Sequence, residues 1–407
     1  MEGEFYSGQD SIWYAKRDKS SRSLILVVFS SFSFGTYEPG GIQQCLLALF
    51  SAGSDEEEDI LNGGIQYVFT SPESLLRGKW RDWATNNSSI KLIAIDEAHT
   101  VLHWGESLSG GEAFRKWYGR LGELRSLVQC PVILLTATAN MAARTELQRK
   151  FCMVDCLEII QNPDRHNIKL FLQCVKCSMP LDDIFYFLIV LLREKKELSD
   201  RFLIFCPTIR TCSKLFTMFR INFKNNMKLI DYIEMYHSKT PDDVKEYVRD
   251  DMSKVNGKIR VLIATSAAGM GVNFKGVANT INFGCPRDMD SFVQQYGRAG
   301  RDGGNAMSIL IFTKRDIRSV DDDMKLYVQN ESHCRRETIL SAYKCKPLTD
   351  RNVHMCCDIC AKKCQVKDCE ECCVSQHPFY NTKLPAYDST SSDDDDDDDV
   401  YSDAEWD

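Results

Sequence analysis

The chain of 407 residues contains no apolar run that approaches the roughly 20 residues needed to cross a bilayer, which argues against a membrane role. A secretory start is also missing, because the apolar stretch Leu24–Phe29 follows a long polar segment that holds both acids and bases. The 18 cysteines are therefore expected in a reducing compartment, where clustered cysteine more often binds metal than forms disulfides. With 43% hydrophobic residues, the chain is long enough for two or three domains with buried cores.

Basic residues are missing from the end of the chain. The segment from Asp388 to Asp407 carries eleven acidic residues, including the run Asp393–Asp399, and no lysine or arginine. Removing these eleven negative charges from the net charge of −8 leaves +3 for the rest. Because a run of like charges repels itself and buries no apolar area, we expect a disordered acidic tail over residues 376–407. Such a tail serves either solubility or the docking of a partner protein.

Short apolar runs alternate with stretches of helical periodicity. The runs predict strands, and the periodic stretches predict helices at Glu112–Leu127, Asp182–Lys195, Pro241–Met252 and Met289–Tyr296. The predicted strands are Leu24–Phe29, Ile65–Phe69, Leu92–Ile95, Val132–Leu135, Phe202–Phe205, Val261–Ala264, Thr280–Phe283 and Ile309–Phe312. This alternation favours an α/β fold with two parallel sheets and a seam near Asn162–Lys169. Functional motifs are expected at the carboxyl ends of the strands, where side chains and helix amino ends converge.

Two acidic residues follow the predicted strand Leu92–Ile95 directly. A carboxylate at a strand end can hold Mg²⁺, and a neighbouring one can orient the water that attacks a γ-phosphate. We assign Asp96 to the metal and Glu97 to the base, with a charged turn after a buried strand as the alternative. Thr136 and Thr138 follow the next strand, where small hydroxyl side chains can relay between a nucleotide site and a neighbouring domain.

These residues carry a resemblance to superfamily 2 helicases. Asp-Glu-Ala-His at 96–99 resembles motif II, which adds His99 to the catalytic residues, and Thr-Ala-Thr-Ala at 136–139 resembles motif III. The segment 100–118 is similar to the aromatic-rich loop of RecQ helicases, so Trp104 and Phe114 are expected to stack on bases. At least one of Trp117 and Tyr118 is expected to pack in the core instead. Thr70 and Ser71 lie in a stretch that resembles the family's phosphate-backbone motif.

The second half of the chain carries the strongest motif, Gln-Gln-Tyr-Gly-Arg-Ala-Gly-Arg at 294–301. Its two arginines lie three residues apart and can stabilise charge on a transferring phosphoryl group. By resemblance to motif VI, Gln294 joins the catalytic residues, Arg301 is the arginine finger and Arg298 its companion. A chance arginine-glycine loop is the alternative. Three further residues and one glycine are assigned by resemblance or by their strand-end position: DNA contacts at Thr208, His237 and Thr265, and close approach to the nucleotide at Gly271.

Cysteines cluster near the end of the body. Cys334-Arg-Arg is followed by His354-Met-Cys-Cys357-Asp-Ile-Cys360, and such spacing suits tetrahedral Zn²⁺. The order resembles the RecQ zinc module, which implies Cys334, His354, Cys357 and Cys360 as ligands. Cys356 could be the fourth ligand in place of His354. Alternatively, the cysteines bind no metal and are free buried thiols. The cysteines of 364–373 are a candidate second site.

The phosphate-binding pattern G-x-x-x-x-G-K-[ST] is missing from the sequence. In the family that loop supplies backbone N–H groups and a lysine to the phosphates, so we expect this chain to bind ATP poorly and to be a truncated motor. The implied organisation is a partial RecA-like ATP-binding domain (1–163), a RecA-like helicase C-terminal domain (164–325), a zinc module (326–375) and the tail. The family's winged-helix domain is not expected after the zinc module.

The resemblance implies an ATP-dependent DNA helicase that moves 3′ to 5′ and serves recombination or repair, in the nucleus. Its cofactors would be ATP, Mg²⁺ and Zn²⁺, and its substrate single-stranded, forked or partly duplex DNA. Because the phosphate loop is missing, the alternative is a catalytically impaired scaffold that binds DNA. An RNA helicase of related motor type is a third hypothesis, which the cysteine module disfavours.

Overall fold

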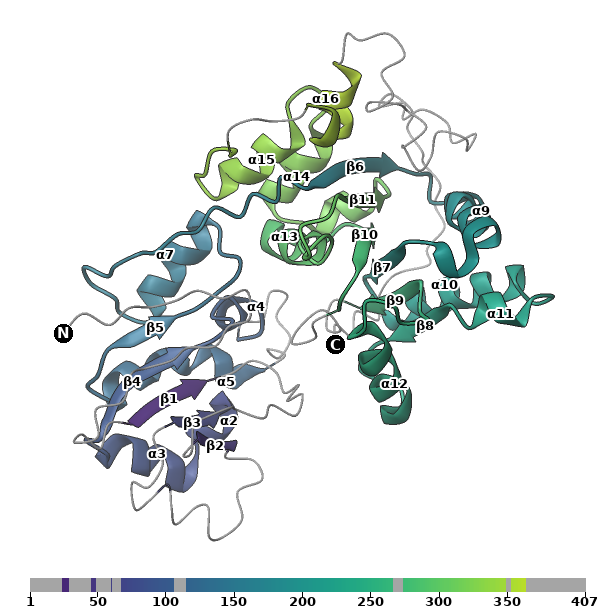
Figure 1. The fold of residues 1–407 in the computed structure, drawn as a ribbon. Helices are drawn as coiled ribbons and strands as arrows, with labels where there is room; N and C mark the ends of the chain where they lie inside the picture. The colour runs from purple at the N-terminus through teal and green to yellow at the C-terminus, as the bar shows by residue number, and fades with distance from the viewer. Residues whose placement is uncertain are drawn as a thin grey trace. The chain divides into compact units, whose positions relative to one another are not determined.

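The computed structural model describes residues 24–28, 45–48, 60, 67–105, 115–265, 274–348 and 353–363. These residues form two compact units. The first contains the described residues up to Thr136 together with Leu147–Val154, and the second contains Ala137–Glu146 and the described residues from Asp155 onward. A parallel sheet lies at the centre of each unit, which confirms the predicted α/β class (Figure 1). The acidic tail lies outside the described residues.

The first sheet has the strand order β2-β3-β1-β4-β5, with all strands parallel. Its strands are β1 (Leu24–Val28), β2 (Cys45–Ala48), β3 (Tyr67–Thr70), β4 (Ile90–Ile95) and β5 (Val132–Leu134). Leu26, Val68 and Ile93 are fully buried and belong to one apolar core. Four of these strands were predicted; β2 was not.

The helical elements of the first unit are short. They are α2 (Pro72–Leu75), α3 (Gly78–Asn86), α4 (Thr100–His103), α5 (Lys116–Gly119), η1 (Leu121–Glu123) and α6 (Leu124–Leu127), with α7 (Met141–Lys150) divided between the units. The prediction of one helix over Glu112–Leu127 was therefore wrong, and its residues 112–114 lie outside the described part. Glycine explains the interruption, because a Cβ on Gly119 would lie 2.5 Å from the carbonyl oxygen of Gly105.

The second sheet has the order β6-β11-β10-β7-β9-β8, again with all strands parallel. Its strands are β6 (Ile168–Cys174), β7 (Arg201–Cys206), β8 (Ile233–Tyr236), β9 (Val261–Thr265), β10 (Val277–Phe283) and β11 (Ala306–Phe312). Strands β7 and β9 are buried along their whole length, as expected for central strands of a parallel sheet. The edge strand β6 was not predicted, and β8 was indicated only by the strand end expected at His237.

Helices of the second unit connect its strands and continue beyond them. They are α8 (Leu181–Ile184), α9 (Tyr186–Lys195), η2 (Lys196–Leu198), α10 (Ile209–Asn222), α11 (Met227–Ile230), α12 (Asp242–Met252), α13 (Met289–Tyr296), η4 (Asp316–Ser319), α14 (Asp322–Gln329), α15 (Arg335–Ala342), η5 (Val353–Met355) and α16 (Asp358–Lys362). The predictions that became α12 and α13 are confirmed, and the predicted Asp182–Lys195 helix divides at Phe185. Within the described ranges, no helix is long and apolar enough to span a bilayer.

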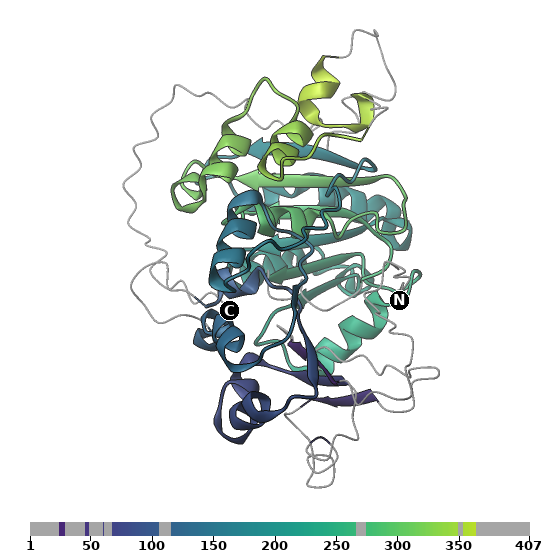
Figure 2. The ribbon, with the colours of Figure 1, turned by 90° about the vertical axis from the view of Figure 1, so that its left-hand side faces the viewer.

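The cysteine-rich segment lies against β6, at one edge of the second sheet (Figures 1 and 2). The N–H of Leu170 donates to the carbonyl oxygen of Cys356 at 3.2 Å. Cys334, Cys356 and Cys357 also share an apolar core with residues of β6, β11 and α13. The segment therefore folds as part of the second unit.

Candidate nucleotide, nucleic-acid and metal sites

The carboxylates of Asp96 and Glu97 follow β4 at the carboxyl edge of the first sheet. The N–H of Asp96 donates to Val28 of β1 at 2.9 Å, and Leu135 donates to Ile95 at 2.8 Å, so the turn is anchored to both neighbouring strands. The side chain of Asp96 accepts from the N–H of Glu97 at 2.9 Å. Burial raises the pKa of the Asp96 carboxyl, and this hydrogen bond opposes the rise.

Glu97 has a backbone φ of +47°, in the left-handed region. This conformation costs a residue with a side chain about 1–2 kcal/mol and recurs at functional sites. Its carbonyl oxygen accepts from the hydroxyl of Thr100 at 2.7 Å and from the N–H of Thr100 at 2.9 Å. The start of α4 thus holds the strained residue in place.

His99 connects the acid pair to the segment after β5. Its Nδ1 lies 3.3 Å from Oε2 of Glu97 and 2.9 Å from Oγ1 of Thr136. The residue is only 5% exposed, so water has little access to its imidazole. The structure therefore brings Glu97, His99 and Thr136 together, as the predicted relay from the nucleotide site requires. Thr138, two residues after Thr136, is buried.

Thr70 and Ser71 are buried, and their hydroxyl groups have local partners. Oγ1 of Thr70 donates to the Ser71 carbonyl at 3.2 Å, and Oγ of Ser71 caps α2 by accepting from the N–H of Ser74 at 3.3 Å. Contact of these hydroxyls with DNA stays a prediction. The structure adds a residue that the sequence did not single out: Arg115, which forms a two-bond ion pair with Glu73 at 2.8 and 2.9 Å.

Arg115 also lies over the aromatic residues predicted for base stacking. Its guanidinium is 5.6 Å from the ring centre of Trp104 and 4.6 Å from that of Tyr118, and these two rings meet edge to face at 5.3 Å. Tyr118 is 1% exposed, which confirms that one of the pair Trp117 and Tyr118 is core. Trp104 is partly buried, and Phe114 lies outside the described residues.

Three predicted DNA contacts lie at the carboxyl edge of the second sheet. Thr208, Thr265 and His237 come at or just after the ends of β7, β9 and β8, which are adjacent strands. Thr208 caps α10 by accepting from the N–H of Thr211 at 3.1 Å, whereas Thr265 and His237 are buried. Gly271 lies outside the described residues.

The arginine loop, defined here as Gly297–Gly304, lies at the opposite edge of that sheet. The N–H of Gly300 donates at 2.8 Å to Val277, the first residue of β10. The expectation of a carboxyl-edge position is therefore wrong for this motif, because α13 carries the chain back along the sheet before the loop begins. Gln294 is half-buried on α13, Arg298 is buried, and Arg301 is exposed.

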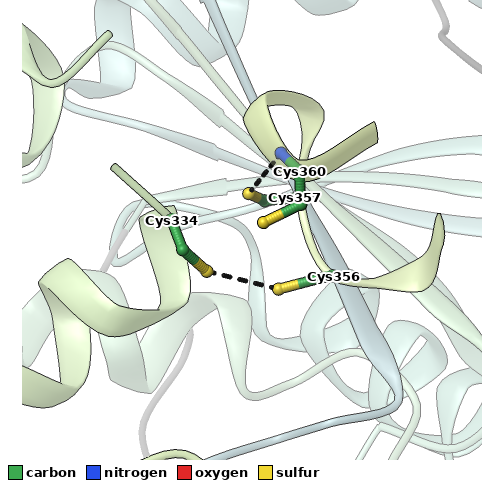
Figure 3. A group of neighbouring side chains, drawn as sticks. All are labelled: Cys334, Cys356, Cys357 and Cys360. Atoms are coloured by element: carbon green, nitrogen blue, oxygen red, sulfur yellow. Dashed lines mark hydrogen bonds between the residues drawn. The ribbon is translucent and has the colours of Figure 1, made fainter. Parts of the chain in front are cut away.

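Four cysteines have the arrangement of a metal site. The sulfur atoms of Cys334, Cys356, Cys357 and Cys360 all lie within 4.8 Å of one another, with Cys334 and Cys356 at 3.4 Å (Figure 3). A tetrahedral zinc site with bonds of about 2.3 Å places its sulfur atoms about 3.8 Å apart, so the group fits. Hydrogen bonds from the other three thiols hold the pKa of Cys334 well below its ordinary value.

The cysteine cluster differs from the predicted ligand set in one member. Cys334, Cys357 and Cys360 come together as expected, but the fourth member is Cys356 rather than His354. The reason is local geometry: the carbonyl of Cys356 accepts from the N–H of Leu170 in β6 and Cys356 is 3% exposed, whereas His354 lies in η5 and is half-buried. The sequence signal for Cys356 was its adjacency to Cys357.

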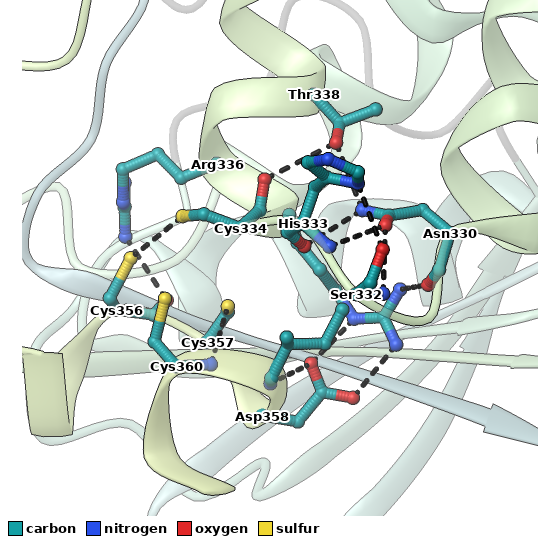
Figure 4. Close-up of polar contacts among 12 residues, drawn as sticks. Asn330, Ser332, His333, Cys334, Arg336, Thr338, Cys356, Cys357, Asp358 and Cys360 are labelled. Atoms are coloured by element: carbon teal, nitrogen blue, oxygen red, sulfur yellow. Dashed lines mark hydrogen bonds and ion pairs between the residues drawn. The ribbon is translucent and has the colours of Figure 1, made fainter. Parts of the chain in front are cut away.

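The two arginines after Cys334 connect the four cysteines to neighbouring segments of the second unit. Arg335 forms a buried ion pair with Asp358, at the start of α16, through Nε at 2.5 Å and Nη2 at 2.9 Å (Figure 4). Arg336 turns toward Cys356 and the segment before β6. The Cys-Arg-Arg sequence therefore contributes one sulfur atom, the Arg335–Asp358 ion pair and a second ion pair, between Arg336 and Asp164 at 2.7 Å.

Comparison with known proteins defines the class. The family model of the helicase conserved C-terminal domain matches residues 183–303. A solved structure of Dbp5 from S. cerevisiae, bound to RNA and ADP BeF3, superposes with a TM-score of 0.51 at 16% identity and covers 76% of each chain, which shows the shared fold. The family model thus assigns residues 183–303 to a helicase C-terminal domain, and the two parallel-sheet units resemble RecA-like helicase folds.

The sequence relatives include helicases named WRN and RecQ. The chain is 27% identical over 359 residues to the mouse bifunctional 3′-5′ exonuclease/ATP-dependent helicase WRN, covering 79% of this chain and 24% of that protein. It is 28% identical over 261 residues to the ATP-dependent DNA helicase RecQ of Haemophilus influenzae, covering 64% of this chain and 38% of that protein. The chain thus resembles RecQ-family helicases of superfamily 2. It spans about a quarter to two fifths of the length of these relatives.

Proposed function

We propose that this chain is the motor part of an ATP-dependent DNA helicase that moves 3′ to 5′ and separates strands during recombination or repair. One observation carries the proposal: Asp96, Glu97, His99 and Thr136 form a connected, partly buried group at a strand edge, with strained backbone at Glu97. The names of the relatives support DNA as the substrate and ATP as the nucleotide that is hydrolysed. A nuclear location agrees with this role.

Each residue of the group has a role in hydrolysis under this proposal. Asp96 would hold Mg²⁺ and Glu97 would orient the attacking water, because the two carboxylates are adjacent: Asp96 accepts from the N–H of Glu97, and the Glu97 carboxylate lies 3.3 Å from His99. His99 would report the state of Glu97 to Thr136 through its shared Nδ1 contact. Arg298 and Arg301 would stabilise charge on the transferred phosphoryl group. Trp104, Phe114, Thr70, Ser71, Thr208, His237 and Thr265 would contact DNA, and Gly271 the nucleotide.

The four cysteines would hold one Zn²⁺. Its chemistry is structural, because four thiolates fill a tetrahedral site and leave no open position for a substrate. The zinc would tie α15 to α16 and so complete the edge of the second unit beside β6.

Hydrolysis with a matched pair of variants tests the proposal. ATPase activity is measured with and without single-stranded DNA for the wild type, Glu97→Gln and Glu246→Gln, an exposed glutamate of α12. Because the phosphate-binding pattern is missing from the sequence, we expect weak but DNA-stimulated turnover in the wild type and in Glu246→Gln. Glu97→Gln should lower this turnover roughly a hundredfold or more. DNA binding without turnover in the wild type would overturn the motor and support the scaffold hypothesis.

Direction and substrate need a separate assay. Partial duplexes with a 3′ or a 5′ single-stranded tail are compared, in DNA and in RNA, under ATP. Unwinding of the 3′-tailed DNA duplex alone is the expected result. Preference for the RNA duplex would replace the DNA helicase by an RNA helicase, and preference for the 5′ tail would reverse the proposed direction.

A further inference from the structure

The arginine loop has backbone geometry that must be held from outside. Gly300 has φ +56° and Gly303 has φ +85°, so the chain turns sharply around Arg301. An arginine that stabilises a transition state must be placed within a fraction of an ångström, because small misplacement costs large factors in rate. What holds this loop is therefore part of how it works.

Two side chains from the segment before β6 bind the carbonyl groups of the loop. Arg165 donates from Nη1 to Gly297 at 3.1 Å, and from Nη2 to Ala299 at 3.2 Å and Gly300 at 2.8 Å. Asn167 donates from Nδ2 to Gly300 at 2.9 Å and to Gly304 at 2.7 Å. The planar fork of a guanidinium reaches several carbonyls at once, which a lysine ammonium cannot do in the same geometry.

Arg336 fixes the same segment from the other side. Its Nη1 donates to Oδ1 of Asp164 at 2.7 Å and to the carbonyl of Arg165 at 2.8 Å. Its Nη2 donates to the carbonyl of Ile168 at 2.6 Å and to that of Cys356 at 3.4 Å. Arg336 and Asp164 are both buried, so water does not compete for this ion pair.

We propose that Arg165 is a positioning residue for the arginine loop, and that the cysteine cluster sets Arg165 through Arg336. Arg336 follows Cys334 by two residues and its Nη2 donates to the carbonyl of Cys356 at 3.4 Å, so one member of the cluster adjoins Arg336 in sequence and another contacts it. Contacts thus run without a break from the cluster, through Arg336 and the Asp164–Arg165 backbone, to the carbonyls beside Arg298 and Arg301. The consequence for hydrolysis rests on the proposed function; the mechanical link does not.

Hydrogen exchange of the whole chain measures the link directly. Amides of 297–304 are followed by mass spectrometry in the wild type, Arg165→Lys and the control Arg318→Lys, which changes an exposed arginine of η4. We expect exchange in the loop to rise roughly tenfold in Arg165→Lys, as for the loss of hydrogen bonds from a charged donor. Exchange in β7 should not change, and Arg318→Lys should match the wild type.

A second pair of variants keeps the test decisive if Arg165→Lys folds poorly. Asn167→Ala removes two loop contacts without altering charge and should raise exchange in the same amides by a smaller factor. Arg336→Lys should raise it as well, although Arg336 does not touch the loop. An unchanged loop in Arg165→Lys and Asn167→Ala, or a uniform rise across the second unit, overturns the positioning role. An unchanged loop in Arg336→Lys alone overturns the coupling to the cysteines.

The activity assay separates this inference from the proposed function. If the wild type hydrolyses ATP, Arg165→Lys should lower kcat with a smaller change in KM, because the loop acts on the transition state. If the wild type shows no turnover, the exchange result still decides whether Arg165 holds the loop.

Discussion

The phenolic oxygen of Tyr343 lies 2.5 Å from Oδ1 of Asp290, and both side chains are buried. Burial and the Asp290 carboxylate raise the pKa of Tyr343, so the hydroxyl keeps its proton and donates. Asp290 also accepts from the N–H of Asn140 at 3.1 Å. The Asp290 carboxylate, in the first turn of α13, thus connects this helix to two other segments. These are Asn140, directly after the Thr-Ala-Thr-Ala motif, and Tyr343, directly after α15.

Tyr343→Phe should destabilise the second unit by about 1–2 kcal/mol, because it removes one partner of a buried carboxylate and leaves the packing of the ring. Urea unfolding followed by circular dichroism measures the change. Tyr247→Phe, at a position that is 43% exposed, is the control and should be neutral. Equal stability of the two variants would show that Asp290 is satisfied without the tyrosine.

Asp251→Ala should destabilise the second unit by about 3–5 kcal/mol, the cost of leaving a buried charge without its partner. Arg201, whose side chain is 1% exposed, contacts Asp251 at 3.4 Å, and Asp251 also accepts from the N–H of Ile259 at 3.0 Å. Asp250→Ala next to it changes a side chain that is 63% exposed. Denaturant unfolding should show a loss below about 0.5 kcal/mol for that control, and similar losses for both would contradict the buried-pair argument.

Gly300→Ala should disturb the arginine loop far more than Gly303→Ala. A Cβ on Gly300 would lie 2.5 Å from Nδ2 of Asn167 and 2.8 Å from the carbonyl oxygen of Gly304, whereas a Cβ on Gly303 meets nothing within 4 Å. Gly303→Ala therefore costs only the left-handed backbone, about 1–2 kcal/mol. Thermal unfolding compares the two, and an equal shift in Tm would argue against close packing at Gly300.

Cys356→Ser should remove bound zinc, and His354→Ala should leave one zinc per chain. The reason is that the sulfur atoms of Cys334, Cys356, Cys357 and Cys360 already form a complete tetrahedral set. Elemental analysis of the purified variants measures the metal content. The reverse pattern would restore His354 as the ligand that the sequence resemblance implied.

Asp96→Asn should stabilise the folded chain at neutral pH while abolishing Mg²⁺-dependent hydrolysis. Burial raises the pKa of Asp96 in the folded state, so the unfolded chain releases this proton first and stability falls as the pH rises above the ordinary carboxyl range. Asparagine is uncharged and has no ionised carboxylate to bury. The stability difference between variant and wild type should therefore shrink toward pH 4 in denaturant titrations; a constant difference would assign it to packing instead.

Much of the fold follows from local patterns. Apolar runs of four to six residues predicted most strands, because a central strand of a parallel sheet is buried on both faces and needs a continuous apolar sequence. Strand β6 escaped prediction because Lys169 and Gln173 interrupt its apolar run, although Lys169 is 4% exposed in the folded unit. Local sequence likewise does not reveal that Arg201, at the start of β7, is buried. Its guanidinium donates to the carbonyl groups of residues 254, 259 and 275, which are distant in sequence.

The chemical identity of each candidate site was present in the sequence: an adjacent pair of carboxylates after a strand, two arginines in a glycine-rich loop, and cysteines at chelating spacing. Where these groups lie, and what holds them, depended on the folded chain. The arginine loop is at the amino edge of its sheet, Cys356 rather than His354 lies in the cysteine cluster, and Arg165 donates to carbonyls more than 130 positions away in sequence. A side chain's chemistry is a local property, whereas its partners are set by hydrogen bonds and packing between distant segments, which no single stretch of sequence contains.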